Sequence, residues 1–312
     1  MATSPAALYE MIVGAYHSTK YVNYFAVGGL TMVIADYLHT FPDEVRLMWP
    51  ASMSLPKVLF FVVRYYSLLH GIFSLTYSLP TNRSAAYCTS AFVRVAVSTK
   101  LVIIASEAIL LIRVYAFAGK DKIVLAFIGV QFVALHVAEL VVLGRFIQSV
   151  KFMDFPLRNL VCIPAQVDIK LLGVVFSLLL CSVSVIMLCM VYVMFRKYRN
   201  LNASSLSTML YQDGLVYFLC LSGLAVANLI VIFGAKNDAL KLMLAQPEAY
   251  MHAILSTRMI LRLRSWSERA YGPGSRDLDA GTWAVAGLDY YSQSTEFSKN
   301  FSAPRSFPST AD

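Results

Sequence analysis

The feature that most constrains this chain is a series of long apolar stretches, each close to the length needed to cross a lipid bilayer. A helix needs about 20 mostly apolar residues for one crossing. Such stretches lie at residues 21–38, 58–77, 91–118, 123–143, 171–195, 215–234 and 240–263. The last stretch is the most interrupted, by Pro247, Glu248, His252 and Arg258. We therefore expect an all-α fold, a polytopic transmembrane bundle of seven helices.

The composition agrees with a membrane protein and excludes several other classes. Apolar residues make up 58% of the chain and charged residues only 14%, whereas soluble domains have about 45–50% and about 25%. A soluble globular enzyme, a disordered chain, a coiled coil and a secreted disulfide scaffold are therefore excluded. The net charge of +8 could suggest nucleic acid, but Lys and Arg on membrane loops give the same total, so we expect no nucleic-acid partner.

The chain is predicted to have three parts. Residues 1–20 lack the basic start of a cleaved signal peptide and are predicted to be an extracellular N-terminal segment. Residues 21–264 form the seven-helix transmembrane domain. Residues 265–312 are rich in Ser, Thr, Gly and Pro, which predicts a disordered cytoplasmic tail. The tail either offers sites to a kinase or cytoplasmic signalling partner, or is only a soluble tether.

Three signals predict that the N-terminus is outside and the C-terminus cytoplasmic. Basic clusters at residues 196–199 and 262–264 lie at membrane edges of the inner side. Cys88 and Cys162 fall on the opposite, oxidising side, where a disulfide is expected and two free thiols are the alternative. The sequon at Asn82 lies in an outer loop and is a glycosylation candidate. The membrane is the plasma membrane or an endomembrane.

Ionisable residues inside spanning helices are costly unless they are paired or hydrated, so they are candidates for function. The predicted ligand-binding residues are Lys100, Glu107, His136, Glu139, Glu248 and His252. Lys100 and Glu107 project from one helix face but are about 10 Å apart, so each needs partners on other helices. His136 with Glu139, and Glu248 with His252, are neighbours on their helices. These groups could be structural contacts, a hydrated polar cavity, a proton relay or a metal site, but their spacing supplies no complete ligand set, so no metal is predicted.

Three arginines receive a structural or interfacial role. Arg64 is expected to extend its long side chain to the headgroups, Arg113 to anchor a helix at the interface, and Arg258 to act likewise. No catalytic constellation and no cofactor motif are present in the sequence.

Several stretches resemble a known family. They are YLHTFPDEVR at residues 37–46 with Trp49, KVLFFVVRY at 57–65, LIRVYA at 111–116, DGLVYF at 213–218 and ILSTRMIL at 254–261. In these the chain resembles basidiomycete fungal multi-pass membrane proteins that open with a domain of unknown function. The resemblance marks a loop acid pair, Asp43 and Glu44, together with Arg64 and Arg258, and it implies no activity.

The leading functional hypothesis is a receptor-like seven-helix protein that senses a small ligand in an outward cavity among the third to seventh helices. The chain departs from the sequence pattern of rhodopsin-like receptors, because the last predicted helix does not end with an Asn-Pro-x-x-Tyr sequence. The first alternative is a small-molecule or ion transporter, with Lys100, Glu107, Glu139 and Glu248 lining its path. The second is an intramembrane enzyme on a lipid or terpenoid substrate, with Glu107 or Glu139 as acid. The lipid bilayer is a partner in each case.

Overall fold

The computed structural model describes residues 5–81, 83–152, 162, 164–198, 205–235 and 238–271. Within these residues the fold is almost entirely helical. The α-helices are α1 (Pro5–Leu47), α2 (Leu55–Ser78), α3 (Ala85–Phe117), α4 (Lys122–Ser149), α5 (Ile169–Tyr198), α6 (Ser205–Gly234) and α7 (Ala245–Tyr271). A two-stranded antiparallel hairpin, β1 (Lys151–Phe152) and β2 (Pro164–Gln166), connects α4 to α5. A short 3₁₀ helix (Asp238–Leu242) precedes α7.

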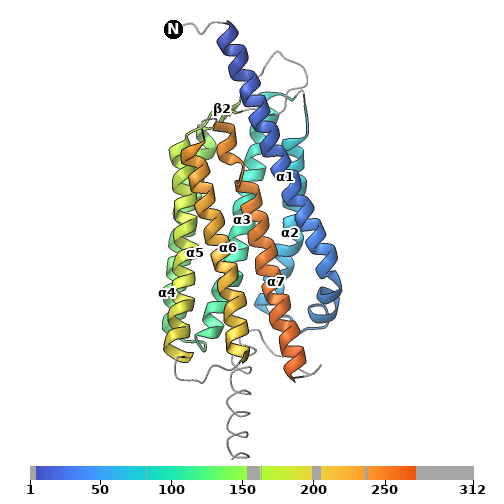
Figure 1. Ribbon diagram of the computed structural model, residues 1–312, viewed down its shortest axis with the longest axis vertical. Coiled ribbons are helices and arrows are strands. Elements are labelled where there is room, and N and C mark those ends of the chain that lie inside the picture. The colour runs from blue at the N-terminus through green and yellow to red at the C-terminus, as the bar shows by residue number, and fades with distance from the viewer. Residues whose placement is uncertain are drawn as a thin grey trace, which may run out of the picture.

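The helices run roughly alongside one another and form an elongated bundle (Figure 1). We call the end with the β-hairpin and the start of α5 the upper end, and the end where α3 stops and α4 starts the lower end. The central helix is α3, which packs against α2, α4, α5 and α7. In turn α7 packs against α1, α2 and α6, so the first and last helices lie side by side.

Among the described residues, five helices are long and apolar enough to cross a membrane. They are α2, α3, α4, the part of α5 from Ile169 to Val193 and the part of α6 from Leu215 to Gly234. Large apolar side chains also cover outward faces of the bundle; on α4, for example, Val130, Val133 and Val137 are all more than half exposed. Such a surface is stable in lipid and not in water. The protein is therefore a multi-pass integral membrane protein.

Local sequence explains several helix ends. The Ser84 side chain accepts a hydrogen bond from the Tyr87 amide at the start of α3, and Asp121 caps α4 in the same way. Between these helices the chain reverses through Gly119 (φ 75°) and Lys120 (φ 62°), a left-handed conformation that glycine adopts readily. Pro247 is the third residue of α7, and the first turn of a helix tolerates proline.

Three helices have ends that differ from the predicted apolar stretches, because hydropathy marks the hydrocarbon layer and a helix can continue beyond it; the predicted span 215–234 itself coincides with the apolar part of α6. First, α1 runs from Pro5 to Leu47, so most of the expected extracellular segment 1–20 is helical, and so is the acid pair Asp43 and Glu44 expected in a loop. Second, α6 begins ten residues before 215, at Ser205. Third, α7 begins at Ala245 instead of 240 and continues to Tyr271, so residues 265–271 of the expected disordered tail are helical. The rest of the tail lies outside the described residues.

The predicted disulfide is confirmed. Cys88, in the first turn of α3, is bonded to Cys162 in the connection between α4 and α5, with their Cα atoms 5.5 Å apart. Cys181, Cys189 and Cys220 are free thiols within α5 and α6. Asn82, the predicted glycosylation position, lies outside the described residues. The bond ties the upper end of the central helix to the β-hairpin region.

Candidate functional site

The six residues predicted to bind a ligand come from α3, α4 and α7, and all are buried in the middle of the bundle. We call them the central cluster: Lys100, Glu107, His136, Glu139, Glu248 and His252. Each side chain is at most 5% exposed. The sequence placed them on three separate helices, and the contacts below show how the fold connects them.

The α3–α4 part of the central cluster is built around Lys100. Its ammonium contacts the Glu139 carboxylate and lies 3.1 Å from His136 Nδ1. His136 Nδ1 is also 3.1 Å from Glu139 Oε2, so the two residues are neighbours on α4, as predicted. Lys100 therefore finds its partners on another helix, and the prediction from its spacing to Glu107 is confirmed.

Glu107 occupies the other side of the same histidine. Its Oε2 lies 3.6 Å from His136 Nε2 and accepts a hydrogen bond of 2.5 Å from Ser182 Oγ on α5. Carboxylates from two helices therefore flank one imidazole. The arrangement connects α3, α4 and α5 through buried polar groups.

The α7 part of the cluster faces α6 and α3. Glu248 accepts a hydrogen bond from the side-chain amide of Asn228 on α6, and it interacts electrostatically with Lys100 and Glu107. His252 interacts electrostatically with Lys100 and His136. No hydrogen bond joins Glu248 to His252 in the described part of the chain, since both ring nitrogens of His252 lack a hydrogen-bond partner there. These two residues share a helix face but do not bond to each other.

Several polar atoms of the central cluster are buried without a hydrogen-bond partner among the described residues. They are Oε1 of Glu107, Oε1 of Glu139, Oε1 of Glu248, Nε2 of His136 and both ring nitrogens of His252. A buried polar atom left unsatisfied costs about 1–3 kcal/mol, so such groups need an explanation. The cluster also holds three carboxyl groups and one lysine. A cation or a hydrogen-bond donor is the kind of group that would satisfy it.

Sequence reasoning missed three buried polar residues, of which Ser182 and Asn228 contact the central cluster. Ser182 and Asn228 are both fully buried, and so is His70 of α2, whose Nδ1 lies 3.1 Å from Ser98 Oγ. The His70 ring also packs 5.2 Å from the ring of Tyr250 on α7. Each of the three lies inside an apolar stretch, which was the signal that could have found them.

A second buried network joins α1, α2 and α7 toward the lower end. Arg64 donates to Glu44 Oε2 (2.5 Å) and to Thr40 Oγ1 (2.7 Å), and its Nη1 lies 3.6 Å from Asp36. The prediction that Arg64 extends to the headgroups was wrong: its side chain is only 4% exposed, because α1 supplies two carboxylates within reach. Asp36 also accepts a hydrogen bond from Arg258, so α7 belongs to the same network.

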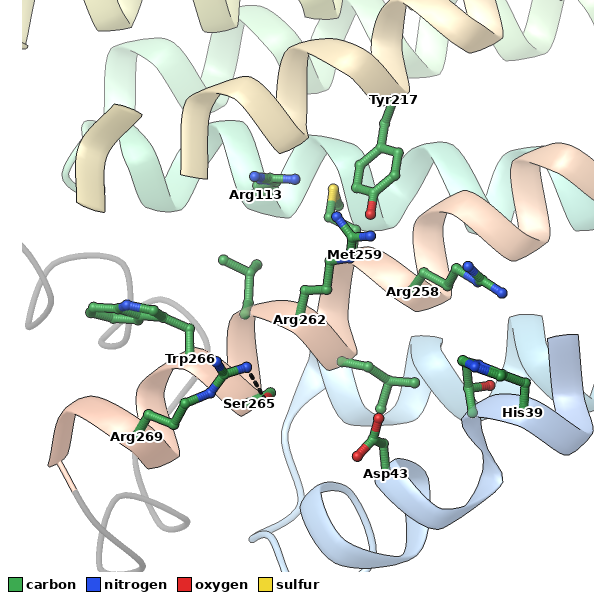
Figure 2. A pocket seen from close by; sticks show the side chains of 13 residues that line it. His39, Asp43, Arg113, Tyr217, Arg258, Met259, Arg262, Ser265, Trp266 and Arg269 are labelled. Atoms are coloured by element: carbon green, nitrogen blue, oxygen red, sulfur yellow. Dashed lines mark hydrogen bonds between the residues drawn. The ribbon is translucent and has the colours of Figure 1, made fainter. Parts of the chain in front are cut away.

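Arg113, predicted to be an interfacial anchor, lies near the lower end of α3 and is buried against other helices. Its side chain lies over the Phe117 ring at 5.3 Å and lines a cavity between α1, α3, α6 and α7 at the lower end (Figure 2). Arg258 lines the same cavity and remains 38% exposed.

The comparisons with known proteins assign no activity. Residues 24–69 match the model of a family described as a family of unknown function (DUF6533). This domain covers most of the α1–α2 hairpin and contains Asp36, Glu44 and Arg64. No curated protein matches the chain.

Proposed function

We propose that this protein is a receptor-like seven-helix membrane protein that senses a small, positively charged ligand at the central cluster. In the proposed topology all seven helices cross the bilayer, the upper end faces outside and the lower end faces the cytoplasm. The resemblance to basidiomycete fungal multi-pass proteins fits this arrangement. Both the plasma membrane and an endomembrane agree with it.

The topology is supported by the length and packing of α1 and α7. At a rise of about 1.5 Å per residue, the 43 residues of α1 and the 27 residues of α7 each exceed the roughly 30 Å hydrocarbon layer. They pack against each other and against α2, which is apolar enough to span. The disulfide at the upper end fits an oxidising compartment, and the arginines at the lower end fit the cytoplasmic side.

The observation that carries the functional proposal is the surplus of carboxyl groups in the central cluster. Glu107, Glu139 and Glu248 face a single lysine, Lys100, and each of the three carries an oxygen without a hydrogen-bond partner among the described residues. A protonated amine would pair with these carboxylates and donate hydrogen bonds to those oxygens, whereas no three His, Cys, Asp or Glu side chains in the described part of the chain are placed to hold a metal ion. The proposed ligand class is therefore a small amine, which is cationic at neutral pH.

The same helices offer a route from ligand binding to the lower end. Both α3 and α7 carry residues of the central cluster, and both continue to the lower cavity at Arg113 and Arg258. A cation that competes with Lys100 for Glu139 would change the contacts between α3 and α4. Because a ligand shifts a conformational equilibrium only through its different affinity for the two states, this competition is the proposed trigger. The tail after Tyr271 would then meet a cytoplasmic partner or a kinase.

The test is a thermal-shift screen of the purified protein in lipid nanodiscs against monovalent cations and small amines. A binder at 100 times its Kd should stabilise the wild type by about 2.7 kcal/mol. Glu107→Gln should abolish this shift, because it removes one of the carboxylates. The matched control is Asp168→Asn, the same chemical change at an exposed residue that caps α5 through its Oδ1. Equal shifts in wild type and Glu107→Gln, or no shift with any compound, would refute the proposal.

Transport is the second candidate, because Lys100, Glu107, Glu139 and Glu248 would equally line a cation path. Proteoliposomes that accumulate the screened cation down its gradient, with Glu107→Gln inactive, would favour transport over sensing. No specific observation in the described part of the chain favours the enzyme hypothesis.

A further inference from the structure

The lower cavity is a second site, distinct from the central cluster. Its volume is about 470 Å³, within the range of about 300–1,000 Å³ that is typical of small-molecule sites. Side chains from α1, α3, α6 and α7 surround it, and in Figure 2 Arg262 of α7 points toward Tyr217 of α6, with Arg113 of α3 nearby. The Arg262 guanidinium lies 5.8 Å from the Tyr217 ring centre.

The described lining of this cavity is strongly basic. Its arginines are Arg113, Arg258, Arg262 and Arg269. The carboxylate in the same lining is that of Asp43, and it already lies 3.2 Å from Arg46. Arg258 already pairs with Asp36, and the guanidinium groups of Arg113, Arg262 and Arg269 add further positive charge to the lining, which attracts anions.

The depth of the cavity matches the headgroup level of a membrane. Two of its buried residues are Arg113, four residues before the end of α3, and Tyr217, two residues into the apolar part of α6. Its outer residues, Arg262 and Arg269, are exposed and lie on the last turns of α7 beside Trp266. Tryptophan is common at the boundary between hydrocarbon and headgroups. The cavity therefore opens where the phosphates of phospholipids lie.

Guanidinium groups bind phosphate oxygens through paired hydrogen bonds, so arginine is favoured wherever phosphate is recognised. We propose that the lower cavity binds a phosphomonoester-bearing anion of the kind carried by phosphorylated inositol lipids. The lining also contains apolar side chains, those of Met259, Leu261 and Leu263. They offer a contact surface to the glycerol and the first acyl carbons of such a lipid. The proposal depends on the helices crossing a membrane and not on the ligand of the central cluster.

The test compares three probes with the full chain in nanodiscs of uncharged lipid. The probes are phosphatidylinositol bisphosphate incorporated in the nanodisc, the soluble inositol trisphosphate headgroup, and inorganic phosphate. Wild type should bind the first two, and the difference between them distinguishes a lipid from a soluble source. The double variant Arg262→Gln/Arg269→Gln should weaken binding about 100-fold, tenfold for each lost charge-assisted contact. Arg262→Lys/Arg269→Lys should give an intermediate loss, because charge remains without the paired geometry.

The matched control is Lys120→Gln/Lys122→Gln, which removes two exposed charges at the same end but outside the cavity. It should change binding less than about twofold, since salt screens the interactions of charges that are exposed to solvent. Equal losses in the two double glutamine variants would show unspecific surface attraction and overturn the proposal, as would no binding of either inositol probe. A synthetic phosphopeptide of residues 272–300 that binds more tightly than the lipid would also overturn it. Unchanged thermal unfolding of each variant shows that the fold is intact.

Discussion

At the scale of single residues, the sequence predicted the members of the central cluster but not the partners of Arg64. An ionisable side chain stands out within an apolar stretch, so Lys100 and Glu107 could be found without a structure. Whether an arginine reaches the headgroups or pairs in the interior depends on which acids other helices bring near it. Asp36 lies in the apolar stretch 21–38 and was the signal that could have predicted an internal partner.

Removing the positive charge of Arg64 should destabilise the protein strongly. Arg64→Gln leaves the fully buried Glu44 carboxylate without its guanidinium, and breaking one side of a buried ion pair costs about 3–5 kcal/mol. Glu44→Gln in the same chain should recover part of this loss, with a coupling of about 0.5–3 kcal/mol between the two changes. The free energies of unfolding of both single variants, the double variant and the wild type complete the cycle.

Arg46→Gln is the control for this cycle. Arg46 is about half exposed and its partner Asp43 is equally exposed, so the change should cost less than about 1 kcal/mol. Strictly additive effects of Arg64→Gln and Glu44→Gln would mean that the short contact between them contributes nothing, and the buried network would then not hold α1 to α2.

At the scale of helices, the existence of each element could be predicted and its ends could not. Hydropathy reports which residues are stable in hydrocarbon, whereas a helix ends where capping groups, turns or tertiary contacts end it. The lower part of α1 continues past the predicted stretch, and there Arg64 of α2 pairs with Glu44, a tertiary contact that hydropathy does not report. Which helices lie side by side was likewise unpredictable, because close approach depends on small residues that hydropathy ignores.

The contact between α1 and α7 requires a glycine at position 29. A Cβ atom there would lie 2.5 Å from Cδ2 of Tyr250, whose side chain is 1% exposed and packs on His70 behind it. Gly29→Ala should therefore destabilise the protein by about 1–3 kcal/mol, the usual cost of overpacking. The adjacent Gly28→Ala is the matched control, because its Cβ would meet no atom within 4 Å. It should be neutral or stabilise the helix by up to about 1 kcal/mol. Thermal unfolding of the two variants tests the packing, and equal stabilities would contradict it.

At the scale of the whole molecule, polar groups lie at three levels of an apolar bundle. The disulfide lies at the upper end, the central cluster in the middle, and the arginine-rich network and cavity at the lower end. The helix α3 passes through all three levels, with Cys88, Lys100 and Arg113 in turn. A change in the tilt or rotation of α3 would therefore alter side-chain contacts at both the upper and the lower end of the bundle. The sequence predicted that the charged residues inside the bundle are candidates for function. Their arrangement at separate levels along the bundle follows only from how the helices pack.

The proposed orientation predicts opposite accessibility for two exposed lysines at helix starts. Lys170 is in the first turn of α5 at the upper end, and Lys122 is the first residue of α4 at the lower end. Each is replaced by cysteine in a chain that keeps Cys88 and Cys162 but has alanine at 181, 189 and 220. In sealed microsomes the cytoplasmic face points outward, so an impermeant maleimide should label Lys122→Cys at once and Lys170→Cys only after detergent. The reverse pattern would place the upper end in the cytoplasm, where a disulfide would be reduced. Labelling of both without detergent would mean that the residues share one side, which an odd number of crossings between them forbids.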